Sequence, residues 1–139
     1  MNALRLWPGL TGLLLVAALS AGCSSISSPS NNQNDTFSGT VTPETGSTAA
    51  VITHTFSVSK TGEMSARITS ISPNNASLIG LALGQLINGS CSVFTLSNLT
   101  GLNRDVFITS IQKGSYCIQV FNGGGIAASQ TYQLTVNHP

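Results

Sequence analysis

Residues 52–59 read Ile-Thr-His-Thr-Phe-Ser-Val-Ser, so apolar or aromatic side chains alternate with short hydroxylated ones. Successive side chains of a β-strand point to opposite faces. Ile52, His54, Phe56 and Val58 would therefore share one face, with threonine and serine on the other. This alternation predicts an antiparallel strand with one buried and one solvent-facing side.

The same alternation recurs along the chain, and turn-forming residues separate the runs. Asn88-Gly89 and the glycines at 123–125 are examples of these turn signals. Eight strands are expected, near residues 36–42, 50–59, 63–71, 77–86, 91–97, 105–112, 115–122 and 130–137. The run 77–86 is rich in leucine and alanine, but Gly80 and Gly84 oppose a helix there.

Short strands with turns every 8–12 residues are typical of a two-sheet sandwich. No segment after the N-terminal 22 residues has a convincing helical period. We therefore predict an all-β fold, an antiparallel two-sheet sandwich of about eight strands with a jelly-roll-like arrangement.

The N-terminus has the pattern of a bacterial lipoprotein signal. Arg5 supplies one positive charge, and residues 10–19 form an apolar stretch too short to span a bilayer. The following Leu19-Ser20-Ala21-Gly22-Cys23 resembles a lipobox, in which the cysteine is lipidated and becomes the first residue after cleavage. An ordinary secretory signal with a chance cysteine is the alternative.

This interpretation divides the chain into three parts. Residues 1–22 are the signal peptide, 23–35 the lipidated Cys23 with a flexible tether rich in Ser and Asn, and 36–139 the β-sandwich domain. Resemblance to Gram-negative lipoproteins implies outer-membrane sorting, because Ser24 rather than Asp follows the cysteine. The expected location is the bacterial cell envelope, with the membrane as partner through the lipid on Cys23.

The charge of the processed chain argues against nucleic acid as a partner. Arg5 would leave with the signal, so the charges of four basic residues would balance those of four acidic ones. Such a chain has no basic patch to neutralise a phosphate backbone.

The cysteine count predicts one disulfide. Without Cys23, the pair Cys91 and Cys117 remains, and an isolated pair in an exported protein is typically oxidised. Spacing of 26 positions does not favour a metal or redox motif. The bond would close a loop whose constraint stabilises the fold by roughly 3–4 kcal/mol.

The end of the chain shows a family resemblance. Residues 114–122 (Gly-Ser-Tyr-Cys-Ile-Gln-Val-Phe-Asn) and 132–136 (Tyr-Gln-Leu-Thr-Val) resemble the last strands of bacterial pre-peptidase C-terminal domains, and residues 54–62 resemble their phenylalanine-bearing strand and glycine turn. The resemblance covers roughly 36–139 and implies a β-sandwich accessory module of exported enzymes. We expect no attached catalytic domain here, unlike that setting, and Asn122 stands where the family often has an acidic residue.

The sequence offers little for a metal or cofactor. Its two histidines, His54 and His138, lie 84 positions apart, and His54 has the parity of a core or interface residue. We predict no metal site and no cofactor; a weak calcium site using Asp105 and Asn103 stays open, although calcium usually takes several carboxylates.

Catalytic motifs are equally sparse. Residues 57–62 contain Ser-x-x-Lys and Lys-Thr-Gly, but both share Lys60 on a predicted strand and turn, unlike penicillin-recognising enzymes. We expect no catalytic residues and a non-enzymatic binding or structural module, with a protein or polysaccharide ligand. The alternatives are an accessory subunit of an exported enzyme and a hydrolase, whose signature would be His54 in an open cleft beside a carboxylate.

Overall fold

Eight antiparallel strands form the described part of the chain. The computed structural model describes residues 32–43, 50–124 and 126–139. The strands are β1 (Gln33–Val41), β2 (Val51–Val58), β3 (Gly62–Ser72), β4 (Ile79–Ile87), β5 (Ser90–Thr100), β6 (Asp105–Ile111), β7 (Gly114–Phe121) and β8 (Gln130–His138). Within these ranges no helix occurs, so the predicted all-β class is confirmed.

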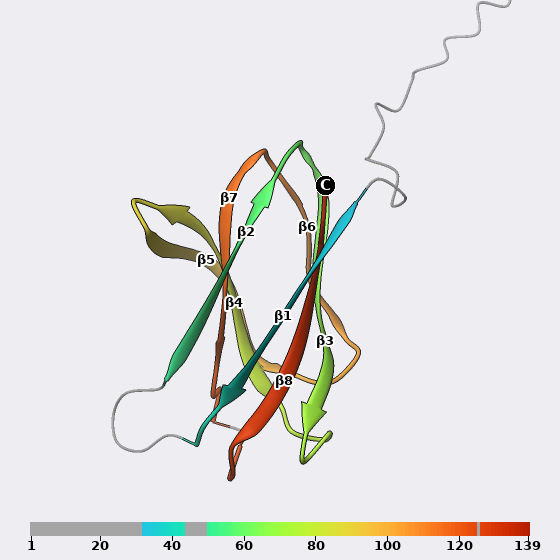
Figure 1. The fold of residues 1–139 in the computed structure, drawn as a ribbon, viewed down its shortest axis with the longest axis vertical. Coiled ribbons are helices and arrows are strands. Elements are labelled where there is room, and N and C mark those ends of the chain that lie inside the picture. The colour runs from blue at the N-terminus through green and yellow to red at the C-terminus, as the bar shows by residue number, and fades with distance from the viewer. Residues whose placement is uncertain (1–31, 44–49, 125) are drawn as a thin grey trace, which may run out of the picture.

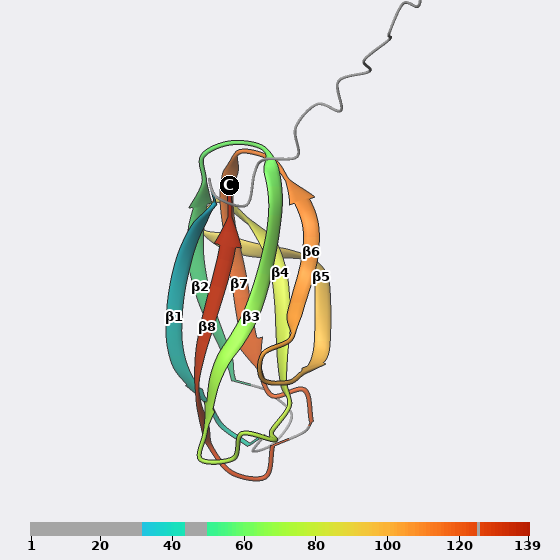
Figure 2. The ribbon, with the colours of Figure 1, turned by 90° about the vertical axis from the view of Figure 1, so that its right-hand side faces the viewer.

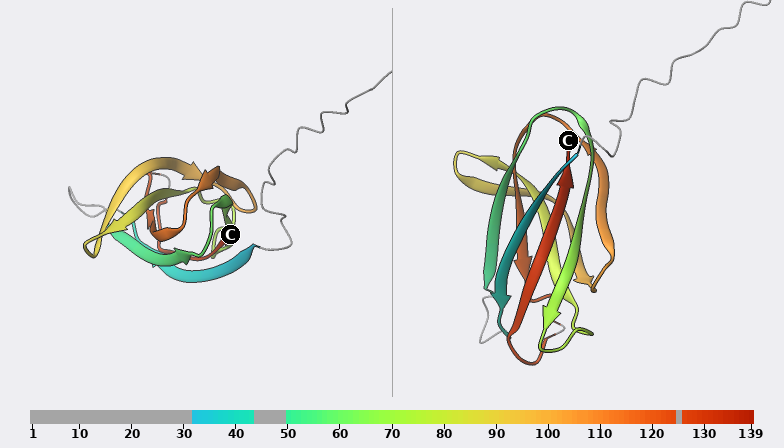
Figure 3. Two further views of the ribbon diagram at one scale, coloured as in Figure 1. Left: turned by 90° about the horizontal axis from the view of Figure 1, so that it is seen from above. Right: turned by 45° about the vertical axis from the view of Figure 1, so that its right-hand side comes forward.

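Two four-stranded sheets make up the sandwich. Sheet A has the order β1-β8-β3-β6, and sheet B has the order β2-β7-β4-β5. Viewed from above, the two sheets face each other around a common interior (Figure 3). The strands pair as β1–β8, β2–β7, β3–β6 and β4–β5, with alternate pairs in alternate sheets. This is a long hairpin rolled into two layers, so the predicted jelly-roll arrangement is confirmed.

The innermost pair, β4–β5, is a true hairpin, and its far end projects from the sandwich in Figure 1. Asn88 and Gly89 connect its strands, with φ angles of 50° and 79°. Positive φ at both central residues is what a two-residue type I′ turn requires, and Asn-Gly supplies it at low cost. A local sequence signal therefore sets the register of this pair.

The core lies between the sheets and follows the predicted parity. Met64, Ala66 and Ile68 of β3 are at most 1% exposed. The inward side chains of β7 and β8 are buried too: Tyr116, Ile118, Val120, Tyr132, Leu134 and Val136. Burial of these side chains supplies the main driving force for the fold.

The first strand begins earlier than the sequence indicated. Gln33, Asn34 and Asp35, predicted to belong to the tether, pair with His138, Asn137 and Val136 of β8. Their polar side chains hide the strand signal, because β1 is an edge strand and pairing is decided by the neighbour β8. The folded unit thus includes residues 33–35.

The sandwich has two open edges, where strands of sheets A and B approach without pairing through backbone hydrogen bonds. One edge lies between β1 and β2 and the other between β5 and β6. Figure 2 shows β1 and β6 at the two sides of sheet A. The functional candidates lie on these edges and on the outer faces of the sheets.

Candidate functional site

The cysteine pair predicted from the sequence is a disulfide. Cys91 of β5 and Cys117 of β7 are joined, with a Cα–Cα distance of 5.8 Å. Strand β4 lies between β5 and β7 in sheet B, so the bond crosses over β4. Cys117 has the outward parity of its strand yet is fully buried, because β5 folds over it.

Gly84 is the residue of β4 that allows this crossing. It pairs with Cys117, and the β4–β5 register shifts beside it. A Cβ at Gly84 would lie 2.6 Å from the backbone oxygen of Ser92 and 3.0 Å from Cys91 Sγ. The absence of a side chain lets β5 approach β4 closely enough for the disulfide to form.

His54 closes the β1–β2 edge together with two aromatic side chains. Its ring stacks on Phe37 at a centroid distance of 4.8 Å, and its Nε2 lies 2.7 Å from the Tyr132 hydroxyl. Burial lowers the pKa of His54 and raises the pKa of Tyr132 to about 12. The lowered pKa favours a neutral ring, and the hydrogen bond between His54 Nε2 and the Tyr132 hydroxyl joins the two sheets.

His138 lies deeper at the same edge and has a carboxylate partner. Its side chain is 1% exposed, and its Nε2 lies 3.0 Å from Asp35 Oδ2. Its ring packs against Phe56 at 5.2 Å. This pair was not predicted, since Asp35 was assigned to the tether; the parity that Asp35 shares with Phe37 and Val41, the inward residues of β1, was the only available signal.

These contacts bear on the hydrolase hypothesis. His54, which that hypothesis placed beside a carboxylate, has Phe37 and Tyr132 as its partners. The histidine that does have a carboxylate, His138, is buried and cannot reach a substrate in this conformation. Both histidines instead join the two sheets at one edge.

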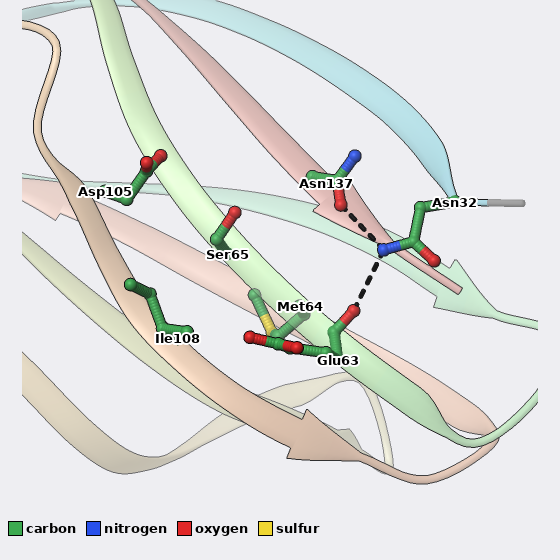
Figure 4. Close-up of a pocket in the computed structure, with 7 residues that line it drawn as sticks. All are labelled: Asn32, Glu63, Met64, Ser65, Asp105, Ile108 and Asn137. Carbon is green, nitrogen blue, oxygen red and sulfur yellow. Dashed lines mark hydrogen bonds between the residues drawn. The ribbon is translucent and has the colours of Figure 1, made fainter. Parts of the chain in front are cut away.

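The outer face of sheet A is polar and carries two adjoining hollows of about 250 and 330 Å³. Asn137 donates to Asn34 Oδ1 at 2.8 Å and accepts from Asn32 Nδ2 at 2.7 Å. Asn32 Nδ2 also donates to the Glu63 carbonyl, as Figure 4 shows. These amides tie the start of β1 to the centre of the sheet.

Asp105 faces these hollows but is already paired. Arg67 donates to both of its carboxylate oxygens, and this hydrogen bonding lowers the pKa of Asp105. A calcium ion at Asp105 and Asn103 would have to displace the guanidinium. No cluster of three or more His, Cys, Asp or Glu that could hold a metal occurs among the described residues.

The second open edge differs from the first because it is apolar and uncovered. A hollow of about 470 Å³ lies between β5 and β6, which we call the β5–β6 groove. It is lined by Phe94, Thr95, Leu96, Ser97, Val106, Phe107, Ile108 and Thr109. Phe94 and Leu96 are each 56% exposed, and Ile108 is 64% exposed. None of the eight lining residues carries a charge.

Both strands of the β5–β6 groove have a β-bulge there. The β4–β5 register skips Phe94, and the β3–β6 register skips two β6 residues, Phe107 and Ile108, opposite Ser65. Phe107 has a φ of 57°, a conformation that a bulky residue rarely adopts. Bulges redirect side chains, and here they accompany the exposure of Phe94 and Ile108. Sequence periodicity could not reveal this groove, since a bulge breaks the period.

The remaining predicted site residue, Cys23, lies outside the described residues, as do the signal peptide and residues 24–31. The part of the chain that is described contains no helix long and apolar enough to cross a membrane. No protein-family model matches the chain, and no curated protein matches it either.

Proposed function

We propose that this chain is a bacterial envelope lipoprotein, anchored through Cys23, whose jelly-roll sandwich is a non-catalytic binding or structural module. The observation that carries the proposal is the Cys91–Cys117 disulfide. The remaining cysteine, Cys23, follows the proposed export signal. Disulfides persist in oxidising compartments outside the cytosol. The lipobox-like Leu19-Ser20-Ala21-Gly22-Cys23 supplies a route to such a compartment.

The distance from the anchor to the fold supports the same proposal. Asn32 lies nine positions after Cys23 and is held by Glu63 and Asn137. An extended chain of that length spans at most about 30 Å. The sandwich would therefore stay close to the membrane that holds the lipid, which in a Gram-negative cell would be the outer membrane.

A polysaccharide or protein ligand is the proposed partner class. The outer face of sheet A offers amide and hydroxyl groups in its hollows, among them Asn34, Thr135 and Asn137. Such groups hydrogen-bond sugar hydroxyls or peptide groups. A resemblance to pre-peptidase C-terminal domains is consistent with a module that assists an exported enzyme, so an accessory subunit remains the alternative function.

The anchor is tested by mass spectrometry of the N-terminal peptide and by membrane fractionation. We expect a diacylglyceryl-modified Cys23 in the membrane fraction, and a soluble, unprocessed or differently processed Cys23→Ala protein. Membrane association that persists in Cys23→Ala with normal processing would contradict the anchor.

The ligand is tested with purified lipoprotein in detergent on arrays of envelope glycans and exported proteins. Asn137→Ala should weaken binding to the sheet A face, whereas Val51→Ser on an edge strand of sheet B serves as the matched control. Equal loss in both variants would argue against the sheet A face. A chromogenic esterase and glycosidase panel tests the hydrolase alternative, for which turnover abolished by His54→Ala would be the supporting result.

A further inference from the structure

The β5–β6 groove exposes apolar surface that the fold itself does not use. Phe94, Leu96 and Ile108 are more than half exposed and line one hollow. Single exposed apolar residues are ordinary, but a contiguous cluster marks a contact surface. At the opposite edge, the His54 and His138 contacts fill the equivalent space.

An added β-strand fits this edge poorly. Strand addition needs a regular row of backbone N–H and C=O groups along an edge. The bulges at Phe94 and at Phe107–Ile108 interrupt that row on both strands, and bulges are a known means of blocking edge pairing. The groove therefore offers side chains rather than a ladder, which suits a partner without backbone groups to pair.

The position of the groove relative to the anchor indicates which class of partner lies within reach. Ile108 lines the groove and also lines the hollow on sheet A that includes Asn32, the first described residue. Figure 4 shows Ile108 and Asn32 at that hollow. Asn32 can lie at most about 30 Å from Cys23. A lipid on Cys23 would therefore hold the bilayer within reach of the groove, at a high effective concentration.

The chemistry of the groove fits a lipid surface. A phenylalanine and two aliphatic side chains form its exposed part, and its polar lining consists of uncharged Thr95, Ser97 and Thr109. Aromatic and aliphatic side chains enter the boundary between headgroups and acyl chains. With no charge in the lining, such a contact needs no anionic lipid and should respond little to salt.

We infer that the β5–β6 groove lies against the bilayer that holds Cys23, with Phe94, Leu96 and Ile108 inserted into its interface. This inference rests on the anchoring proposed above. The sandwich would then have a fixed orientation: the β5–β6 edge toward the lipid and the β1–β2 edge away from it. The outer face of sheet A would stay accessible to a ligand.

The test places a tryptophan reporter in the groove. The processed chain from Cys23 has no tryptophan, because Trp7 belongs to the signal. Phe94→Trp and Ile108→Trp put the reporter on either side of the groove. Val51→Trp, at an edge strand on the far side of sheet B and 50% exposed, is the matched control. Circular dichroism and thermal unfolding establish that each variant is folded.

The protein is attached to vesicles chemically, so that natural lipidation does not enter the test. Cys91 and Cys117 are in a disulfide, which leaves the Cys23 thiol for a maleimide lipid in uncharged phosphatidylcholine vesicles. We expect blue-shifted emission and quenching by acyl-chain-brominated lipid for Phe94→Trp and Ile108→Trp. Val51→Trp should show neither change, and added salt or anionic lipid should alter the result little.

Three outcomes would overturn the inference. The first is no bromine quenching at Phe94→Trp or Ile108→Trp in vesicle-bound protein. The second is equal quenching at Val51→Trp, which would mean unoriented contact. The third is a blue-shifted groove reporter without vesicles, accompanied by a dimer in sedimentation, which would assign the groove to a second copy. Failure of the anchor proposal is recognised separately, by an unmodified Cys23 in cells.

Discussion

At the residue scale, the structure depends on a few positions where one side chain decides whether two strands can approach. Gly84 is the strongest case, because the backbone of Ser92 occupies the space where its Cβ would be. His54 is another, because its ring is hydrogen-bonded to the Tyr132 hydroxyl between the two sheets. Each position leads to a measurable prediction.

Gly84→Ala should lower the free energy of unfolding by about 1–3 kcal/mol, the usual cost of forcing an extra methyl group into a packed site. The nearest backbone atom, Ser92 O, cannot yield without moving β5. The matched control is Gly114→Ala, whose Cβ would meet Tyr116 at an ordinary 3.6 Å; its stability should change by less than about 1 kcal/mol. Chemical denaturation of oxidised protein measures both, and similar losses in the two variants would contradict the close-approach argument.

His54 should make the fold less stable as the pH falls. Burial lowers its pKa in the folded state from the ordinary 6.5, so below pH 6.5 the unfolded chain binds a proton that the folded chain resists. Stability is therefore full above pH 6.5 and decreases from there down to the folded-state pKa. His54→Gln should remove this decrease. Denaturation of both proteins between pH 7.5 and pH 5 measures it; parallel profiles would show that His54 is not responsible.

At the element scale, the edge strands behave differently from the central ones. β3, β4, β7 and β8 each have two neighbours. The alternating sequences of β3 and β8 follow directly from burial on one face, whereas residues 79–84 of β4 are buried on both faces. β1 has one neighbour, and its first residues are polar. Its start is held by contacts that β8 supplies, including the Asp35–His138 pair and the Asn34–Asn137 hydrogen bond.

A chain that starts at Thr36 should therefore be less stable than one that starts at Asn32. The shorter chain loses three residue pairs with β8 and leaves the buried His138 ring without Asp35. A loss of about 1–3 kcal/mol is expected, because a buried polar group left without its partner costs that much. Thermal and urea unfolding of the two chains check this, with a start at Asn34 as an intermediate control. Equal stability would mean that residues 33–35 contribute nothing to the fold.

At the scale of the whole molecule, the jelly roll brings together strands far apart in sequence. The outermost pair, β1–β8, joins residues about a hundred positions apart, and only β4–β5 is a local hairpin. Folding into such a topology costs much conformational entropy, because long loops of the unfolded chain must be closed. The Cys91–Cys117 disulfide reduces that loss by fixing β5 to β7 across β4.

Cys91→Ala/Cys117→Ala should unfold with a free energy lower by roughly 3–4 kcal/mol, from the loss of the loop constraint. The double variant should keep its fold, because both cysteines lie outside the hydrophobic core between the sheets. Denaturant unfolding measures the difference, and reduced wild-type protein is the control that should match the double variant. A loss in the variant without a similar loss on reduction would indicate a packing role for the sulfurs.

Much of this molecule could be predicted from local pattern alone. The alternation in residues 52–59 and the other runs, together with turn residues such as Asn88-Gly89, predicted all eight strands and the two-sheet class. The reason is physical: a strand buried on one face must alternate, and a tight hairpin needs residues that tolerate positive φ. The disulfide followed from counting cysteines once Cys23 was assigned to the lipid.

The tertiary structure decided what depends on neighbours distant in sequence. In the tertiary structure Asp35, which was expected in the tether, bonds to His138, and Tyr132 bonds to His54. Phe94 and Ile108, each at a bulge, line the same hollow. No local pattern pairs these residues, because each contact joins residues from different strands and a bulge breaks the period of two. The sequence by itself determined the strands and the buried face of those that alternate clearly, β2, β3, β7 and β8; the rolled topology determined which edge closed and which stayed open.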